Sequence, residues 1–492
     1  MYDDHNREAE GRLVMKLSDG RELPVEMWKT RIVQKINLVP VADRLKAIEE
    51  GGYNTFLMKS NVIFLDMLTD SGVNAMSDNQ LAAWMNSDDC YAGSMTFYEF
   101  EKAVQDVLGL KYVMNVHQGR AAEHLIPKVF AKPGDIVPTN FHFTTTRAHI
   151  EILQCTMPEI YKDEAMNTAS KYPFKGEMDP EKLNAIIKKN GAKKIAFVRM
   201  EATTNLMGGQ PFSMANLKEI KEICVKNKIM MVLDGSLMCE NAYMIREREK
   251  GYENKTVAQI VKEMCSVPDL YYMSGRKNTC VRGGCIATNN EEIFLKIKPW
   301  LPVYEGFFTY GGMSQREVGM MAVGIREMVD PDLAGATVRQ IKFGIDKLVA
   351  AGVPVVTPPG GLGIHVDAGK FLPHVPHNEY PAGALCAALY IASGIRSMER
   401  GTVSMDRTPD GVERMSELEL CRLACPRRVY SQSQIEYAID RLTWLHKNKK
   451  LIKGLKFTYE PPVLRFFLGK LAPIDNWGEK LAAAYKKEMG PV

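Results

Sequence analysis

Several features that would assign a broad class of protein are missing from this sequence. None of its ten cysteines forms a Cys-x-x-Cys pair, and Cys280-x4-Cys285 and Cys421-x3-Cys425 lack the neighbouring residues that would complete a zinc site. No apolar run approaches the ~20 residues that a membrane span needs. The chain begins Met-Tyr-Asp-Asp-His, which is acidic and polar, so we expect no signal peptide.

The net charge is also unremarkable in size. It is +4 over 492 residues and spread along the chain, so it gives no argument for binding to nucleic acid or to a membrane. Cysteines scattered through apolar runs are typical of reduced, buried thiols. We therefore expect a cytoplasmic protein, long enough for two or three domains.

Apolar, strand-like runs alternate with helical patterns from about residue 110 to 290. Lys194–Arg199, Ile229–Leu233 and Leu270–Met273 predict strands, and Ser213 is a suitable cap for a helix that runs to Lys228. Such a rhythm favours an α/β fold with a mostly parallel sheet that is covered on both faces. In sheets of this kind, ligands bind at the carboxyl ends of the strands.

Composition and runs of Pro and Gly suggest how the chain divides into domains. Residues 1–24 form a polar extension, and residues 25–76 are assigned to an arm and the first part of a smaller domain. Residues 77–330 would form the large domain. The run Pro358-Pro359-Gly360-Gly361 and a new strand pattern at Gly363–Asp367 predict a smaller C-terminal α/β domain over residues 331–492.

Polar groups follow two of the predicted strands. Asp234 ends one, and Ser274-Gly275-Arg276-Lys277 ends another. A pyridoxal phosphate enzyme needs such a pair, because the lysine forms the Schiff base and the acid keeps the pyridinium nitrogen protonated. Ser274 and Arg276 can hold the phosphate. Taken alone, a surface Lys-Arg pair and a helix-capping Asp explain these residues equally well.

Four further groups occur in the chain order of a fold-type I pyridoxal phosphate enzyme. The turn His117–Arg120 precedes a helix and suits an anion, or is an ordinary turn. Phe143 can stack on a cofactor ring or belong to the core. Asn205 can bond a ring hydroxyl and a carboxylate, or occupy a turn. Arg422 can clamp a substrate carboxylate or face water from an edge strand. Together they favour the functional interpretation.

Ten longer motifs make the pattern specific. They are Tyr53–Leu57, Leu68–Gly72, Tyr91–Ser94, His117–Arg120, Phe143–Arg147, Asn205–Gln210, Cys239–Tyr243, Met273–Gly275, Arg396–Gly401 and Pro426–Tyr430. With these motifs, over about residues 35 to 470, the chain resembles the aromatic amino acid β-eliminating lyases, tyrosine phenol-lyase and tryptophanase. It looks closer to tyrosine phenol-lyase.

The resemblance implies a fold-type I, aspartate aminotransferase-like enzyme with a mostly parallel seven-stranded sheet and a smaller α/β domain. It implies a homotetramer with cofactor sites between paired subunits. Lys277 would form the Schiff base, Asp234 would pair with the pyridinium and Phe143 would stack on the ring. The residues implied to hold the rest of the cofactor are Gln118, Gly119, Arg120, Asn205, Ser274 and Arg276.

The resemblance also implies how an amino acid substrate is held. Thr69, Ser71, Asn205 and Arg422 would bind its carboxylate, and Phe466 and Phe467 would close over it. Tyr91, from the neighbouring subunit, would be the general acid for the leaving group. Thr144 and Arg400 match the pair that distinguishes tyrosine phenol-lyase from tryptophanase and would contact a phenolic hydroxyl. The expected reaction is carbon–carbon β-elimination from tyrosine or a related amino acid, giving a phenol, pyruvate and ammonia.

Two other functions stay open. One keeps the lyase scaffold and changes the substrate to tryptophan, a cysteine S-conjugate or another β-substituted amino acid. The other is a degraded, non-catalytic paralogue that acts as a binding partner, although Lys277, Asp234, Tyr91 and Arg422 are all retained.

Two positions depart from the family pattern. Where the family has Asp-Ala-Thr-Arg, this chain has Asp234-Gly235-Ser236-Leu237, so the arginine that contacts the ring hydroxyl of the cofactor is missing. Without that cation, we expect the pKa of the Schiff base to change. Arg282 replaces an asparagine in a loop that helps to bind a monovalent cation such as K⁺, with Gly72 and with an acid that Asp89 matches. A guanidinium in the place of the cation would make activity independent of potassium.

Overall fold

The computed structural model describes residues 14–20, 22–408 and 410–492, and the chain divides into two compact units. Unit 1 comprises Met1–Lys29, Ser71–Lys162 and Pro173–Arg339, and unit 2 comprises Thr30–Asp70, Asp163–Tyr172 and Gln340–Val492. The division after Arg339 falls within helix α13 (Pro331–Ala350). Over the described ranges, we find no helix with the length and apolar character that crossing a membrane requires.

Unit 1 is built on a five-stranded sheet. Its order is β4 (Tyr112–Val116), β8 (Gly284–Thr288), β7 (Leu270–Ser274), β6 (Met231–Asp234) and β5 (Val198–Glu201). Strands β5, β6 and β7 are parallel, whereas β8 is antiparallel to both β7 and β4, so only β8 opposes the common direction of these five. Isolated bridges at Ile136 and Thr139 join two further segments to the β5 edge, and the predicted seven strands are reached only when these are included.

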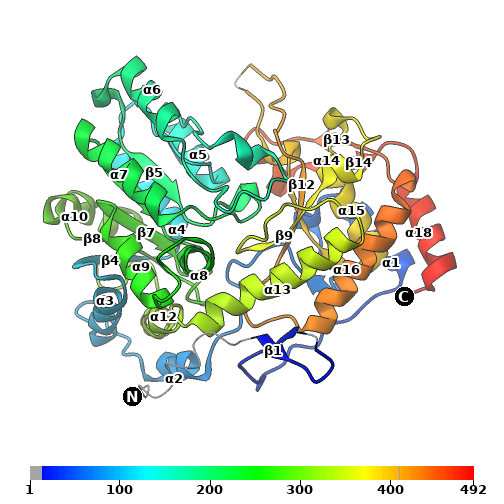
Figure 1. Ribbon diagram of the computed structural model, residues 1–492, viewed down its shortest axis with the longest axis horizontal. Helices are drawn as coiled ribbons and strands as arrows, with labels where there is room; N and C mark the ends of the chain where they lie inside the picture. The colour runs from blue at the N-terminus through cyan, green and yellow to red at the C-terminus, as the bar shows by residue number, and fades with distance from the viewer. Residues whose placement is uncertain (1–13, 21, 409) are drawn as a thin grey trace. The chain divides into compact units, whose positions relative to one another are not determined.

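Helices surround this sheet, as Figure 1 shows. On one face, α4 (Gly119–Phe130) and α5 (Thr144–Ile152) contribute Leu125, Ile126 and Ile150 to a buried cluster with the sheet residues Val232, Tyr272 and Ile286. The other helices of unit 1 before α13 are α2 (Asp78–Asn86), α3 (Met95–Leu108), α6 (Pro180–Asn190), α7 (Met214–Asn227), α8 (Met238–Arg248), α9 (Val257–Ser266), α10 (Glu291–Ile297), α11 (Leu301–Tyr304) and α12 (Gln315–Glu327).

Local sequence explains where these helices begin. Ser77, Thr256 and Ser314 each cap a helix and pair with a Gln or Glu three residues later, which forms a capping box. The predicted cap Ser213 accepts from the backbone N–H of Asn216, so the helix expected over 213–228 is confirmed as α7.

Unit 2 combines short sheets with a helical layer. Its strands are β3 (Leu65–Asp66), β9 (Gly363–Asp367), β10 (Ile395–Arg396), β11 (Met398–Arg400), β12 (Leu420–Ala424), β13 (Leu455–Tyr459) and β14 (Lys470–Pro473). They pair as β11-β12-β9, β10-β3 and β13-β14. The helices are α1 (Val41–Glu50), α14 (Ala368–Phe371), α15 (Pro381–Ser393), α16 (Gln432–Lys447), α17 (Arg465–Leu468) and α18 (Trp477–Met489).

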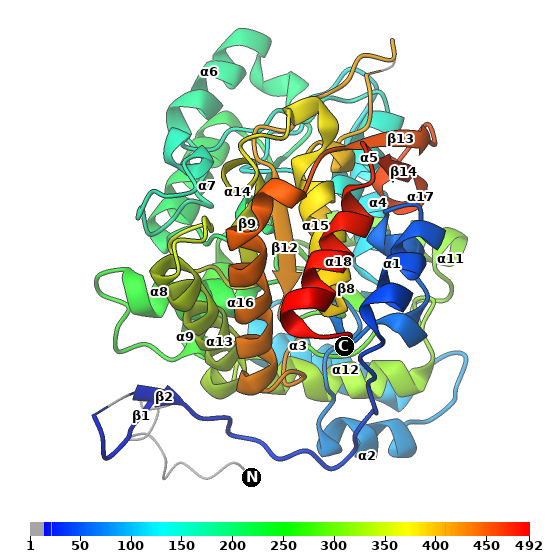
Figure 2. The same cartoon turned by 90° about the vertical axis from the view of Figure 1, so that its right-hand side faces the viewer.

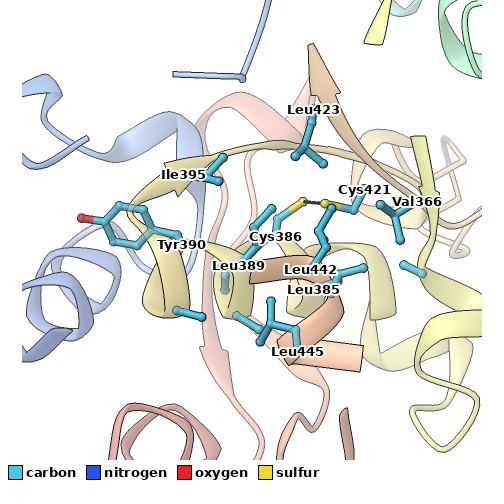
Figure 3. Close-up of a cluster of buried hydrophobic side chains, with 14 of the residues drawn as sticks. Val366, Leu385, Cys386, Leu389, Tyr390, Ile395, Cys421, Leu423, Leu442 and Leu445 are labelled. Atoms are coloured by element: carbon cyan, nitrogen blue, oxygen red, sulfur yellow. Dashed lines mark hydrogen bonds between the residues drawn. The ribbon is translucent and has the colours of Figure 1, made fainter. Parts of the chain in front are cut away.

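The core of unit 2 is centred on α15. Every residue of this helix is buried, and α1, α16 and α18 pack against it, as Figure 2 shows. Figure 3 shows Leu385 and Leu389 of α15 among Leu423, Leu442 and Leu445, with the thiols of Cys386 and Cys421 3.4 Å apart. A helix that is apolar on all sides needs such complete coverage.

Some predicted elements need correction. The strand expected over Lys194–Arg199 begins only at Val198, because Ala192–Lys194 forms a 3-10 turn and Ile195 makes a single bridge. Of the predicted extension 1–24, residues 1–13 and 21 lie outside the described residues. Val14–Lys16 and Glu22–Pro24 pair as an antiparallel hairpin, β1-β2.

We predict that Leu389→Ala lowers the free energy of unfolding by about 2–5 kcal/mol, because it opens a cavity in a fully buried site. Urea denaturation followed by tryptophan fluorescence measures the change. Val349, which is 51% exposed, provides the control, and Val349→Ala should change the value by less than about 0.5 kcal/mol. Equal losses in the two variants would contradict this description of the core.

Candidate functional site

Asp234 lies at the carboxyl end of β6 and is 5% exposed. The strand register pairs it with Glu201 of β5 on one side and with Tyr272 of β7 on the other. Because alternate residues of a strand share a face, Arg199, Glu201, Asp234 and Tyr272 all project from the same side of the sheet. A buried polar group therefore forms where a ligand of a parallel sheet is expected.

The carboxylate of Asp234 is held at both oxygens. Oδ2 accepts from Nη2 of Arg199 at 2.6 Å and from the hydroxyl of Tyr272 at 2.9 Å, and Oδ1 accepts from the backbone N–H of Ser236 at 3.0 Å. Burial raises the pKa of Tyr272 well above its ordinary value, so its hydroxyl stays protonated and remains a donor. Asp234 is thus fixed in position.

Two more buried acids adjoin this group. Glu201 accepts from the same Nη2 of Arg199 at 2.9 Å, and burial raises its pKa while Arg199 lowers it. Glu123 of α4 accepts from the hydroxyls of Thr145 and Thr146 at 2.5 and 2.8 Å. Burial is the main cause that raises the pKa of Glu123, and the charge of Asp234 raises it further. The region around Asp234 is therefore rich in carboxyl groups.

A second site forms where α4 begins. Gln118 is its N-cap and Gly119 its first residue. A Cβ added at Gly119 would lie 2.8 Å from Cβ of Ser274, so only glycine permits this approach of the helix N-terminus to the end of β7. Gln118 also bridges to Gly283. The three loops at 118–120, 274–277 and 281–284 consequently meet, and free N–H groups at a helix N-terminus bind anions.

Three guanidinium groups converge on these loops. Burial lowers the pKa of Arg276, and the positive charges of Arg282 and Arg120 lower it further. Arg276 also donates to the hydroxyl of Ser71 at 3.1 Å, and its carbonyl accepts from the N–H of Gly72 at 2.8 Å. Mutually repelling cations beside a helix N-terminus fit a doubly charged phosphate, which would relieve the repulsion.

Lys277 lies near an aromatic ring. Its Nζ is 5.5 Å from the centre of the Phe143 ring, and its carbonyl accepts from the side-chain amide of Asn74. Phe143 is the N-cap of α5, whose first residue is Thr144, and Glu123 anchors the next two threonines of that helix. Asn205 joins the acid group because its backbone N–H donates to Glu201 at 3.1 Å.

Tyr91 and Asp89 have other surroundings. Tyr91 is 70% exposed, stacks on Phe307 at 5.9 Å and lies 3.3 Å from the hydroxyl of Tyr310. Asp89 pairs with Arg316 at 3.2 Å. These contacts do not draw either residue into the group around Lys277. Among the residues that can be described, there is no cluster of three or more His, Cys, Asp or Glu arranged to hold a metal ion.

Unit 2 brings another set of predicted residues together. Arg422, in the centre of β12, donates to the carbonyl of Leu68, the neighbour of Thr69, at 2.8 Å. Arg400 of β11 lies over the ring of Phe466 at 5.6 Å, and the rings of Phe466 and Phe467 are 3.9 Å apart. Burial lowers the pKa of Arg422 to about 10, and Asp70 raises it only in part, so an anion at this position would be stabilised.

At position 237, where the family pattern has a positively charged arginine, this chain has an uncharged leucine. Its side chain is 3% exposed, and its carbonyl accepts from the hydroxyl of Thr203 at 2.9 Å where α8 begins. Next to it, Gly235 makes room for Tyr271, whose Cε2 would lie 2.2 Å from an added Cβ. At this turn, therefore, a buried leucine and the ring of Tyr271 lie beside Gly235.

The chain matches a known protein family and the sequences of known proteins. Residues 66–441 match the family model described as "Beta-eliminating lyase". The chain belongs to the β-eliminating lyase family. Tyrosine phenol-lyases from Symbiobacterium thermophilum and Pasteurella multocida are 45% and 43% identical to it over 452 and 455 residues, which cover 92% of this chain and 99% of each relative. The lyase is thus an enzyme similar to tyrosine phenol-lyases, and its family implies pyridoxal phosphate as the cofactor.

Solved structures agree on the fold of the lyase. A Sphingomonas wittichii serine palmitoyltransferase has a TM-score of 0.53 at 13% identity, covering 79% of this chain and 88% of the other. A complex of SepCysS with the N-terminal domain of SepCysE has a TM-score of 0.51 at 14% identity, covering 78% and 94%. At such low identity these likenesses show the fold alone, which is the predicted fold-type I architecture.

The residues of unit 1 fit this cofactor. The glycine-lined helix N-terminus with three arginines suits the phosphate, Phe143 offers a ring for stacking, and Lys277 supplies an amine beside it. The residues around Asp234 that were not predicted from the sequence are Arg199, Tyr272, Glu201 and Glu123. The available signal was the pair of charges in Val-Arg-Met-Glu at the end of an apolar strand, since charges in such strands must find partners.

We predict that Gly119→Ala weakens binding of pyridoxal phosphate by about tenfold, because the methyl group must displace Ser274 or the start of α4. A fluorescence titration of the cofactor-free lyase measures this. In Gly369→Ala the added methyl group meets nothing closer than 3.5 Å, so this control should bind as the wild type does. Unchanged affinity in Gly119→Ala would contradict the assignment of this helix N-terminus to the phosphate.

Proposed function

We propose that the lyase cleaves tyrosine or a closely related aromatic amino acid, with water, into a phenol, pyruvate and ammonia. When bound, pyridoxal phosphate supplies an electron sink for the bond changes at the α-carbon. The observation that carries this proposal is the placement of Lys277 beside the ring of Phe143, since a ring cofactor needs both a stacking partner and an amine. The 45% identity to tyrosine phenol-lyases supports the same choice of substrate.

The proposed roles in cofactor binding follow from charge and contact. Asp234 would face the ring nitrogen, Asn205 the ring hydroxyl and Phe143 the ring plane, and Lys277 would carry the cofactor. Gln118, Gly119, Arg120, Ser274 and Arg276 would hold the phosphate through the helix N-terminus and the converging cations.

Two groups would move protons in the reaction. Nζ of Lys277 takes the proton from the α-carbon of the substrate, and the hydroxyl of Tyr91 gives a proton to the ring carbon that leaves. The bond between that ring carbon and the β-carbon breaks, and water converts the remaining three-carbon fragment to pyruvate and ammonia. Protonation of the leaving carbon is needed because a free aryl anion is far too basic to depart.

The substrate would be held at its two ends. Thr69, Ser71, Asn205 and Arg422 would bind the carboxylate, which suits a buried guanidinium whose pKa burial has lowered. Thr144 and Arg400 would bind the phenolic hydroxyl. Phe466 and Phe467 would close over the ring and exclude water, in keeping with their contact to each other and to Arg400.

A homotetramer in the cytoplasm is part of the proposal. Tyr91 is largely exposed beside Phe307 and Tyr310, and an aromatic surface of this kind suits contact with a second copy. Tyr91 would then act in the neighbouring subunit's site. The described cysteines are all free thiols, which supports a reducing compartment.

We also propose that Arg282 takes the place of a monovalent cation. Its charge acts on Arg276, whose carbonyl binds Gly72, so it lies close to the loop that the family pattern assigns to the cation. Asp89 would be the acid from the neighbouring chain.

Arg400→Met should lower kcat/KM for tyrosine by about 10- to 100-fold, the loss expected for a hydrogen bond to a charged group. An S-alkyl cysteine has no phenolic hydroxyl, so its elimination should change far less. Pyruvate release measures both reactions. Arg441→Met, which removes a guanidinium 4.8 Å from the Tyr437 ring, is the matched control and should leave both unchanged. Equal losses for the two substrates would argue against recognition of a phenol and favour a different natural substrate.

Replacing potassium with tetramethylammonium should not alter pyruvate release by the wild-type lyase, because Arg282 supplies the positive charge. Arg282→Asn should be activated by potassium, since an amide restores a neutral oxygen ligand. Arg326→Asn, at an exposed ion pair with Asp106, is the control and should stay independent of potassium. Strong activation of the wild type by potassium would disprove the substitution.

A further inference from the structure

Asp234 has a charged partner within the protein itself. Nη2 of Arg199 lies 2.6 Å from its Oδ2, and Nε of Arg199 donates to the hydroxyl of Tyr272, which in turn donates to the same Oδ2. Arg199, Tyr272 and Oδ2 therefore form a closed set of hydrogen bonds. Oδ1 accepts only the backbone N–H of Ser236 in the hydrogen bonds seen among the described residues, which leaves it capacity for another donor.

The guanidinium of Arg199 contacts two acidic side chains. It lies 2.9 Å from Glu201 through the same nitrogen that binds Asp234, and it is 1% exposed. One cation therefore contacts two carboxyl groups, and Glu123 adds a third acid nearby. Burial lowers the pKa of Arg199, but Tyr272, Glu201 and Asp234 raise it well above its ordinary value, so Arg199 stays charged.

This arrangement changes what Asp234 offers to a ligand. A carboxylate whose charge is shared with a buried guanidinium at 2.6 Å is a weaker acceptor for a further donor than a free carboxylate. It is also held in one orientation, because two of its hydrogen bonds come from side chains fixed on neighbouring strands.

We propose that Arg199 is a positioning residue for the cofactor: with Tyr272 it holds Oδ2 of Asp234, leaves Oδ1 for the ring nitrogen and weakens the hold of Asp234 on the proton of that nitrogen. The proposal rests on the proposed function, in which Asp234 faces the ring nitrogen. It adds that the electron-withdrawing strength of the ring is set by Arg199 as well as by Asp234.

The test compares two cofactors on the whole, cofactor-free lyase. One is pyridoxal phosphate, and the other is its analogue in which C–H replaces the ring nitrogen. The ratio of their dissociation constants isolates the interaction at the ring nitrogen, since a general loss of structure weakens both cofactors alike. A merely structural role for Arg199 would leave this ratio unchanged.

In the variant Arg199→Met with Glu201→Gln, the guanidinium and the second acid that it contacts are removed together, so Asp234 loses its partner and no unpaired acid is left at position 201. The preference for pyridoxal phosphate over the analogue should rise about tenfold, as for a charge-assisted hydrogen bond that regains its strength. The control is Lys221→Met with Asp269→Asn, which removes an ion pair beside the amino ends of β6 and β7. It should leave the ratio of the two dissociation constants unaltered.

Tyr272→Phe gives a second measurement that does not depend on the folding of the double variant. It removes one donor to Oδ2 without changing any charge, and the preference should rise about threefold. If the wild type prefers pyridoxal phosphate over the analogue and both variants leave that preference unchanged or reduce it, the proposed role of Arg199 is overturned. The assignment of Asp234 would stand in that case. Equal binding of the two cofactors by the wild type and all variants would overturn the assignment of Asp234 itself, and with it the proposal.

Discussion

The site depends on fixing the carboxyl group of Asp234 at the buried end of a central strand. A buried, unpaired carboxylate is costly, and here the cost is met by Arg199, Tyr272 and the N–H of Ser236. The contacts from Arg199 and Tyr272 depend on the register of β5, β6 and β7, which places Glu201, Asp234 and Tyr272 side by side, whereas the N–H of Ser236 is local to Asp234. A shift of one residue in any of these strands would turn the group to the other face.

Charge of the opposite sign gathers at the second part of the site. The acids around Asp234 lie on the sheet face that α4 covers, whereas Arg120, Arg276 and Arg282 converge where α4 begins. The close approach of Gly119 to Ser274 ties the helix N-terminus to the end of β7. A cofactor with a ring cation and a phosphate dianion matches this separation of charge, and Lys277 with Phe143 provides its covalent and stacking partners.

The sequence contains enough to predict most of this site, but not its electrostatic background. Asp234, Gly119 and Lys277 were predictable because each follows an apolar strand, where parallel sheets bind ligands. Arg199 was not, because its partner is 35 residues away and their contact depends on strand register, which periodicity alone does not determine. The start of β5 was misplaced for a similar reason: an apolar run such as Ile195–Phe197 fits a strand or a buried connection equally well. The surroundings of Leu237 also required the structure, since only the structure shows that this side chain is buried and that Gly235 beside it makes room for the ring of Tyr271.

Lys277 is proposed to carry pyridoxal phosphate at this site. Reduction of the cofactor-loaded lyase with borohydride, followed by proteolysis and mass spectrometry, tests it directly. We expect one pyridoxyl phosphate group per chain, on the peptide that contains Lys277. Labelling of a different lysine, or the absence of any labelled peptide from protein saturated with the cofactor, would contradict it.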